Sequence, residues 1–189
     1  HRLEFGIVGA PCGEIQRKVN EINAALYPAK TAYIDADHAS DDEALNPDYS
    51  CFTSITDKIT YRSLQTFKTL DRFDHQIYLN DHDMVLINGN HFNSSAQIVV
   101  CHPGKLESLR RKLNRIDNVA LILLAAGVTE TPNFLKLHLG RSFAHIPIGN
   151  WDDQKFIQSF FRSQISPPPL KGLVLAGGKS SRMGNDKTV

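Results

Sequence analysis

The stretch that decides the fold of this chain is Leu3-Glu4-Phe5-Gly6-Ile7-Val8-Gly9-Ala10-Pro11-Cys12-Gly13-Glu14-Ile15. Its first half, residues 3–8, is mostly apolar and predicts a buried strand that runs into a glycine turn. Residues 16–26 follow with helical spacing, and Pro28 closes that segment. The apolar face of the expected helix comprises Val19, Ile22, Ala25 and Leu26. A strand, a turn and a helix in this order open an α/β domain.

The turn at residues 9–15 stands where a phosphate-binding P-loop would stand, after the first strand and before the first helix. A working P-loop reads G-x-x-x-x-G-K-[ST], in which the lysine reaches the β- and γ-phosphates and the hydroxyl binds Mg²⁺. Here the loop is one residue shorter, and Glu14 and Ile15 occupy the lysine and hydroxyl places. Because a carboxylate repels phosphate, we interpret the turn as a degenerate P-loop that binds neither GTP nor ATP tightly.

The rest of the first 165 residues continues the alternation of strands and helices. Further strands are expected at residues 31–34, 50–56, 83–89, 96–101, 119–124 and 143–147. Further helices are expected at residues 105–115 and 132–139, and a last one, capped by Asp152 or Asp153, runs through Phe161. Residues 58–70 fit either a helix or a strand followed by a helix. Such alternation predicts a mostly parallel, doubly wound α/β sheet.

Residues 3–165 resemble the molybdopterin-guanine dinucleotide biosynthesis adaptor protein B, a small GTP-binding P-loop protein. The resemblance rests on the first strand and its turn, the strand 31–34, and the strand 83–89. In that family the last of these strands commonly ends in Glu-Gly, whereas this chain has Asn88-Gly89. The chain therefore departs from the family at both catalytic places. The resemblance implies a P-loop-like domain at residues 1–165, and an alternative function is a non-catalytic pseudo-P-loop adaptor that binds a partner or a cofactor.

A proline-rich linker is expected at residues 166–171, where Pro167, Pro168 and Pro169 favour an extended spacer. Residues 172–189 then start a second segment. Leu173-Val174-Leu175 predicts a buried strand, and Gly177-Gly178 allows backbone N–H groups to approach an anion closely. We expect this segment to be the first strand and loop of a truncated, Rossmann-like nucleotidyltransferase domain.

The string Leu175-Ala176-Gly177-Gly178-Lys179-Ser180-Ser181-Arg182-Met183-Gly184-Asn185-Asp186-Lys187 resembles the signature of molybdenum cofactor guanylyltransferases. The resemblance implies that the Leu175–Gly178 loop and Lys187 bind the nucleotide. It also implies that Arg182 and Lys187 act in catalysis on the triphosphate. The parent enzyme would transfer GMP from GTP to molybdopterin with Mg²⁺, and its metal-binding carboxylates would lie beyond residue 189. A nucleotidyltransferase with another acceptor is the alternative, and the sequence as given is expected to be inactive alone.

Composition narrows the remaining classes of function. The chain is 41% hydrophobic and 22% charged with a net charge of +1, so no global field favours nucleic acid. No apolar run approaches the roughly 20 residues of a membrane span, so no membrane partner is expected. The odd number of cysteines, Cys12, Cys51 and Cys101, favours reduced thiols in the cytoplasm. Molybdenum cofactor biosynthesis proteins are the partners that the resemblance implies.

Two other sets of residues favour a structural interpretation over a functional one. Carboxylates and a histidine gather after the second strand and could bind a metal, although a solvated acidic loop is the simpler interpretation. They are Asp35, Asp37, His38, Asp41 and Asp42. Residues 123–127 look like a second nucleotidyltransferase loop, but Glu130 follows where cations would help. A buried strand and a turn explain that stretch.

Overall fold

Parallel strands form the centre of the molecule in this computed structural model, which describes residues 3–36, 53–57, 60–66 and 71–165. Six of them make one sheet in the order β2-β5-β1-β6-β7-β8, and every neighbouring pair is parallel. Their bounds are β1 Leu3–Val8, β2 Thr31–Ile34, β5 Met84–Asn88, β6 Ala96–Cys101, β7 Val119–Leu124 and β8 Ile148–Asn150. The prediction of a mostly parallel α/β sheet is confirmed.

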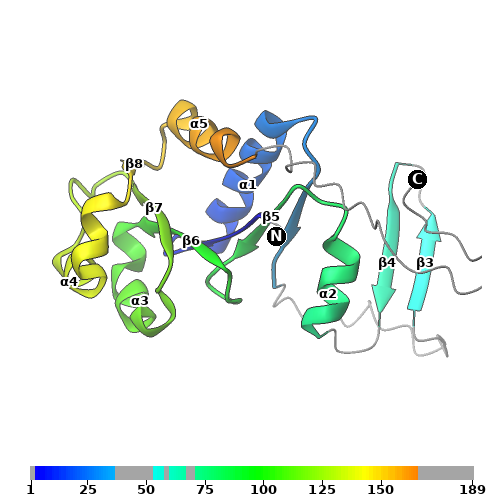
Figure 1. Cartoon of the computed structure of the whole chain (residues 1–189), viewed down its shortest axis with the longest axis horizontal. Coiled ribbons are helices and arrows are strands. Elements are labelled where there is room, and N and C mark those ends of the chain that lie inside the picture. Colours follow the sequence, from blue (N-terminus) through cyan, green and yellow to red (C-terminus); the bar gives the residue numbers. More distant parts are fainter. Residues whose placement is uncertain (1–2, 37–52, 58–59, 67–70, 166–189) are drawn as a thin grey trace, which may run out of the picture.

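Helices cover both faces of the sheet, as a doubly wound fold requires. In Figure 1, α1 (Cys12–Leu26) and α5 (Gln154–Gln164) lie on one side, and α2 (Arg72–Leu79) and α3 (Leu106–Arg111) lie on the other. The helix α4 (Asn133–Leu139) packs through Leu135 into the same core as α3. A separate antiparallel pair is made by β3 (Thr53–Asp57) and β4 (Arg62–Thr66). In the described part of the chain no helix is long and apolar enough to cross a membrane.

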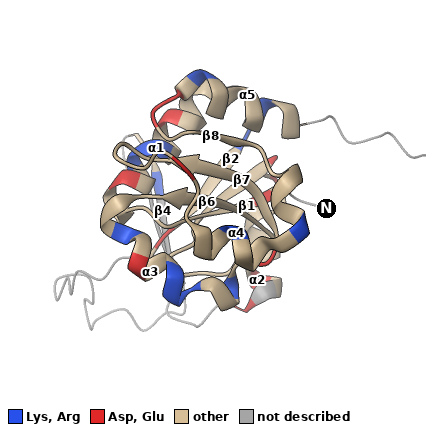
Figure 2. Cartoon of the chain, turned by 90° about the vertical axis from the view of Figure 1, so that its left-hand side faces the viewer, with Lys and Arg blue, Asp and Glu red and all other residues tan. Residues whose placement is uncertain are grey.

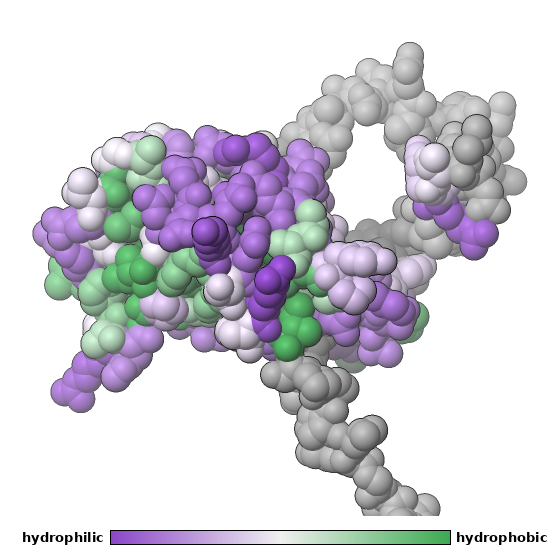
Figure 3. Space-filling view, turned by 90° about the horizontal axis from the view of Figure 1, so that it is seen from above, coloured by the Kyte–Doolittle hydropathy of each residue, from purple (hydrophilic) through white to green (hydrophobic). Residues whose placement is uncertain are grey.

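Alternation along β1 divides the interior into two cores. Phe5 and Ile7 point into the core under α1 and α5, whereas Val8 points into the core under α3 and α4. The first core is aromatic, because Phe5 packs edge-to-face against Phe160 and Phe161 at ring-centroid distances of 6.0 and 5.6 Å. The view over α1 and α5 in Figure 3 shows a mainly hydrophilic exterior with smaller hydrophobic areas.

Three expectations about the elements need correction. The first helix begins at Cys12 rather than Gln16, because Pro11 ends the turn early and its carbonyl accepts from the N–H groups of Glu14 and Ile15. The strand expected at residues 143–147 is wrong: residues 140–145 form a 3-10 helix, and the strand follows at 148–150. The helix expected at 105–115 is shorter, with 3-10 turns on both sides.

The structure assigns a strand and a helix to the region after residue 57, for which the sequence left two alternatives. Residues 62–66 form a strand, in agreement with the strand-then-helix alternative, and the helix α2 begins only at Arg72. Asp71 starts that helix with a capping box, in which its carboxylate accepts from the N–H groups of Phe73 and Asp74. The final helix has the predicted acidic cap, since Asp153 accepts from the N–H of Phe156 at 3.0 Å.

Candidate functional site at the carboxyl edge of the sheet

The turn after β1 and the loop after β5 lie side by side, because these strands pair in parallel with Ile7 opposite Asn88. Side-chain hydrogen bonds then join the two segments. Asn90 accepts from the N–H of Gly9 at 3.3 Å and donates to the carbonyl of Ala10 at 2.8 Å. In open parallel sheets, ligands bind at this carboxyl edge, so the paired loops define the candidate site.

Gly9 is required by the chain geometry at this edge. Its φ of +96° lies in the left-handed region, and a Cβ on it would overlap the carbonyl oxygen of Val100 on β6. Gly13 differs, because a Cβ there would meet no atom within 4 Å. The first glycine of the turn is therefore explained by packing alone, and the second faces open space at the start of α1.

The two P-loop positions named from the sequence, residues 14 and 15, carry neither a cation nor a hydroxyl. Glu14 lies in the first turn of α1, and its Oε1 is 3.5 Å from Nε2 of His102, which follows β6. Ile15 is fully buried in the first core. A P-loop lysine supplies a positive charge at this place and a hydroxyl supplies a metal ligand. In this chain the lysine position holds the Glu14 carboxylate, which lies beside the His102 imidazole. The hydroxyl position holds the apolar side chain of Ile15.

Asn88 takes the place of the expected carboxylate and is bonded to a carboxylate from another strand. The Asn88 amide, which is fully buried, donates to Oδ1 of Asp35 at 2.8 Å. The hydroxyl of Tyr33 donates to Oδ2 of Asp35 at 2.7 Å, and the N–H of Ala36 donates to its Oδ1 at 2.8 Å. Burial raises the pKa of Asp35, but these three hydrogen bonds and the nearby His91 outweigh burial and hold the pKa below its ordinary value.

The pKa of Tyr33 is shifted in the opposite direction to that of Asp35. Partial burial, and then the adjacent Asp35 carboxylate, raise the pKa of its phenol well above the ordinary value. The phenol therefore stays protonated and donates to the carboxylate. Together Tyr33, Asp35 and Asn88 make a hydrogen-bonded cluster that fixes the ends of β2 and β5.

Cys12 and His91 meet at the centre of the joined loops. The Sγ of Cys12 lies 3.3 Å from Nε2 of His91, and the Asn90 amide lies 3.8 Å from the same sulfur. This pair was not predicted from the sequence. The available signal was that both residues follow parallel strands, but which strands are neighbours cannot be read from their order in the chain.

A lysine from α3's carboxyl end reaches the same loops. Nζ of Lys112 donates to the carbonyl of Asn90 at 3.0 Å and lies 3.4 Å from its side-chain oxygen. Burial lowers the pKa of Lys112, and Arg115, Lys105 and Arg111 lower it further. Figure 2 shows Lys and Arg residues grouped around α3. This lysine brings positive charge close to the turn, but its bonds go to the loop itself.

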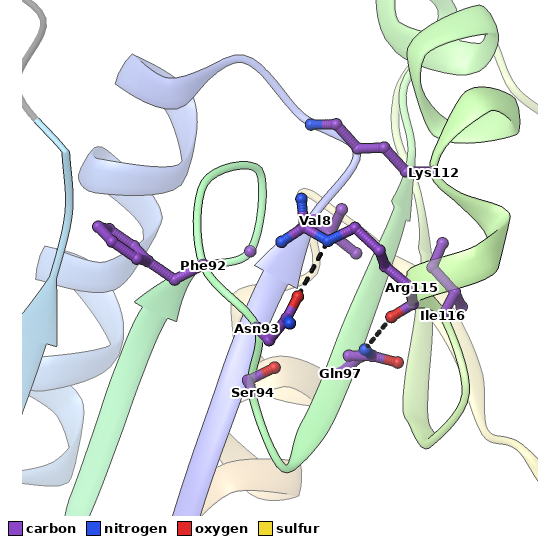
Figure 4. A pocket seen from close by; sticks show the side chains of 9 residues that line it. Val8, Phe92, Asn93, Ser94, Gln97, Lys112, Arg115 and Ile116 are labelled. Carbon is purple, nitrogen blue, oxygen red and sulfur yellow. Dashed lines mark hydrogen bonds between the residues drawn. The ribbon is translucent and has the colours of Figure 1, made fainter. Parts of the chain in front are cut away.

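The pocket below this lysine is already filled by polar contacts of the chain, as Figure 4 shows. Nε of Arg115 donates to Oδ1 of Asn93 at 2.9 Å, and the amide of Gln97 donates to the carbonyl of Arg115 at 2.6 Å. Ser94 lies on the same wall, and its hydroxyl donates to the carbonyl of Ala96. These bonds tie the β5–β6 connection and the start of β6 to the 3-10 turn after α3, and they explain the polar lining without a ligand.

Most of the remaining predicted site residues fall outside the part of the chain that the structure describes. Leu175, Ala176, Gly177, Gly178, Arg182 and Lys187 lie outside the described residues, as do the linker 166–171 and Asp37, His38, Asp41 and Asp42 of the possible metal set. Among the residues that are described, no three His, Cys, Asp or Glu side chains are arranged to bind a metal ion.

The loop after β7, which resembles a second nucleotidyltransferase loop, forms a tight turn. Ala125 is buried, and Gly127 has a φ of +84°. Glu130 pairs with Lys136 at 2.7 Å, and that pairing lowers the pKa of the Glu130 carboxyl. The structural interpretation of this stretch fits these contacts.

The sheet order and the position of the turn define an α/β fold of the P-loop type with a degenerate phosphate-binding turn. The fold is similar to the crystal structure of molybdopterin-guanine biosynthesis protein B, with a TM-score of 0.55 and 15% sequence identity over 86% of this chain and 99% of that one. It is also similar to Bacillus subtilis MobB, with a TM-score of 0.58 and 13% identity over 87% of this chain and 98% of that one. The predicted resemblance of residues 3–165 to the B-type fold is confirmed. No family model matches the chain, and no curated protein matches it significantly.

Proposed function

We propose that residues 1–165 form a non-hydrolysing P-loop-type module of molybdenum cofactor biosynthesis that binds a partner or the cofactor. The observation that carries this proposal is Glu14, a carboxylate at the lysine position that lies 3.5 Å from His102. The two similar structures supply the pathway, since both are B-type proteins. The proposal separates the fold, which resembles theirs, from nucleotide hydrolysis, for which the required groups are replaced.

Electrostatics support the loss of phosphate binding at the turn. Backbone N–H groups at the start of a helix attract an anion, but Pro11 has no N–H to offer. At ~4 Å a pair of unit charges is worth about 1 kcal/mol in water and about 4 kcal/mol at an intermediate dielectric. Replacing a lysine by Glu14 turns that attraction into repulsion, which exceeds what the remaining N–H groups contribute.

The first test asks whether the module hydrolyses nucleotides. The chain is incubated with Mg-GTP and Mg-ATP at millimolar concentration, and phosphate release is measured beside the Gly13→Phe variant. We expect no release above background from either protein. Because a side chain at Gly13 enters open space, this variant blocks the turn without disturbing the core. Turnover by the original chain that disappears in the variant contradicts the proposal.

A second candidate function concerns the parent protein and rests on the motif at residues 175–187. We propose that the parent is a molybdenum cofactor guanylyltransferase that joins GMP from GTP to molybdopterin and releases pyrophosphate with Mg²⁺. The loop Leu175–Gly178 would bind the nucleotide, and Arg182 and Lys187 would stabilise negative charge on the triphosphate. A nucleotidyltransferase with a different acceptor would keep the same nucleotide contacts.

Pyrophosphate release by the longer protein tests this candidate. Release that requires both GTP and molybdopterin, falls at least ~100-fold in Lys187→Ala, and persists in Gly13→Phe is the expected result. The Gly13→Phe control separates the two candidates, because it alters only the amino-terminal turn. Release with GTP and a different acceptor favours a nucleotidyltransferase with that acceptor. No release with any acceptor contradicts nucleotidyl transfer by the parent protein altogether.

A further inference from the structure

Two of the described side chains at the carboxyl edge form a nucleophile–base pair that the proposed function does not use. Cys12 is exposed at the first position of α1, and its Sγ lies 3.3 Å from Nε2 of His91. A thiol within hydrogen-bond distance of an imidazole has the arrangement by which enzymes and redox proteins activate cysteine. The two residues come from different strand ends, so the fold itself brings them together.

Charged and polar groups of neighbouring segments surround this pair. The start of the α1 helix, which carries partial positive charge, lies at Cys12, and Lys112 brings a cation to the neighbouring loop, where its Nζ donates to the carbonyl of Asn90 at 3.0 Å. The Asp35 carboxylate lies at the same edge of the sheet, where it accepts from the Asn88 amide at 2.8 Å.

We propose that Cys12 is a reactive thiol that forms a mixed disulfide with small-molecule disulfides such as oxidised glutathione, with His91 as its proton acceptor. Nε2 of His91 takes the proton from Sγ, and the thiolate attacks one sulfur of the disulfide. A new sulfur–sulfur bond forms as the old one breaks, and the leaving thiolate takes the proton from His91. The small disulfide is the oxidant, and no other redox partner is required.

The chain carries an internal reference for this chemistry. Cys101 lies at the end of β6, is fully buried, and has its pKa raised to about 12 by burial. A buried thiol of this kind reacts slowly because both access and the thiolate fraction are small. Exposure, a base and nearby positive charge therefore separate Cys12 from Cys101 within one protein.

The experiment treats the reduced 189-residue chain with oxidised glutathione near neutral pH and assigns each adduct by peptide mass mapping, so that products at Cys51 are counted separately. We expect the adduct at Cys12 to form at least ~100-fold faster than the one at Cys101. His91→Gln should slow the Cys12 reaction by about tenfold, and Cys12→Ser should abolish that adduct. His145→Gln, which changes an exposed histidine at the end of the 3-10 helix 140–145, is the matched control and should leave the rate unchanged.

A second comparison keeps the proposal testable if His91→Gln does not fold, which its thermal melting curve reveals. The Cys12 rate is measured in the folded chain and again in urea at the same pH. The proposal predicts about tenfold faster reaction in the folded chain, since only the fold supplies His91. Equal rates in the two states, or a folded His91→Gln protein that reacts as fast as the original, overturns it.

Discussion

The sheet and the turn on its carboxyl edge differ in how closely each follows the P-loop architecture. The sheet keeps a buried β1 at its centre, paired in parallel with β5 on one side and β6 on the other. The turn keeps Gly9, which β6 requires, but has Glu14 at the lysine position and a buried Ile15 at the hydroxyl position. The comparison shows that the fold depends on burial and backbone geometry, whereas phosphate chemistry depends on a few side chains that can change without disturbing the sheet.

The largest expected effect on the free energy of unfolding comes from a substitution in the core beside the sheet. Phe161 is fully buried and packs edge-to-face against Phe5 and Phe160. Phe161→Ala should lower the free energy of unfolding by about 3–5 kcal/mol, because the cavity cannot refill and the aromatic contacts are lost. Leu137→Ala is the control, since this leucine is 82% exposed. Urea denaturation measures both, and a loss below about 1 kcal/mol at Phe161 contradicts the assignment of the core.

A smaller effect separates the two glycines of the turn. Gly9→Ala should cost on the order of 1–3 kcal/mol, because the new side chain is strained at positive φ and overlaps the carbonyl of Val100. Gly13→Ala should be neutral or slightly stabilising, since it lies in a helix and its side chain enters open space. Thermal melting of the two variants decides this. If both substitutions cost the same, Gly9 is not held by its packing against β6.

The smallest effect concerns Asp35, whose carboxylate accepts three hydrogen bonds but is exposed to solvent. Asp35→Asn should lower the free energy of unfolding at pH 7 by about 0.5–1 kcal/mol, the lower part of the range for such bonds because of the exposure. The folded-state pKa lies below the ordinary value of 3.8, so this stabilisation is complete above the unfolded pKa and is lost as the pH falls through the folded one.

The measurement for Asp35 is urea denaturation of both proteins at pH 7 and at about pH 2.5, below the ordinary carboxyl range. The difference in free energy of unfolding between the two proteins should shrink at the lower pH. The Asp35 side chain is then closer to neutral, as the Asn side chain is at both pH values. A difference that is the same at both pH values indicates that the substitution acts through packing rather than through the charge of Asp35.

Most of the fold could be predicted from the sequence, because its signals are local. The apolar runs at residues 3–8, 84–88, 96–101 and 119–124 are strands, and Asp153 caps the last helix as expected. The misplaced strand at 143–147 has a local cause too: a 3-10 helix occupies 140–145, beginning at Gly140, which has a φ of +53°. The α2 helix begins at Arg72, beyond the range 58–70 in which a helix was one alternative, and the capping box of Asp71 and Asp74 marks its start.

The candidate site was harder to predict, because it depends on which strand ends are neighbours. Glu14 and Asn88 could be named as departures by comparing each with a known motif. The pairing of Cys12 with His91 and of Lys112 with Asn90 follows from the position of β5 next to β1. Strand order is a long-range property of packing, and no local pattern in the sequence encodes it.

The central claim is that the turn at residues 9–15 is no longer a nucleotide-phosphate site, and calorimetry tests it most directly. Mg-GTP and Mg-ATP are titrated into the 189-residue chain and into its Gly13→Phe variant, which fills the open space beside the turn. The comparison removes any contribution from residues 172–189, which both proteins share. The account predicts the same isotherm for both proteins with each nucleotide. Micromolar binding to the original chain that is lost in Gly13→Phe contradicts it.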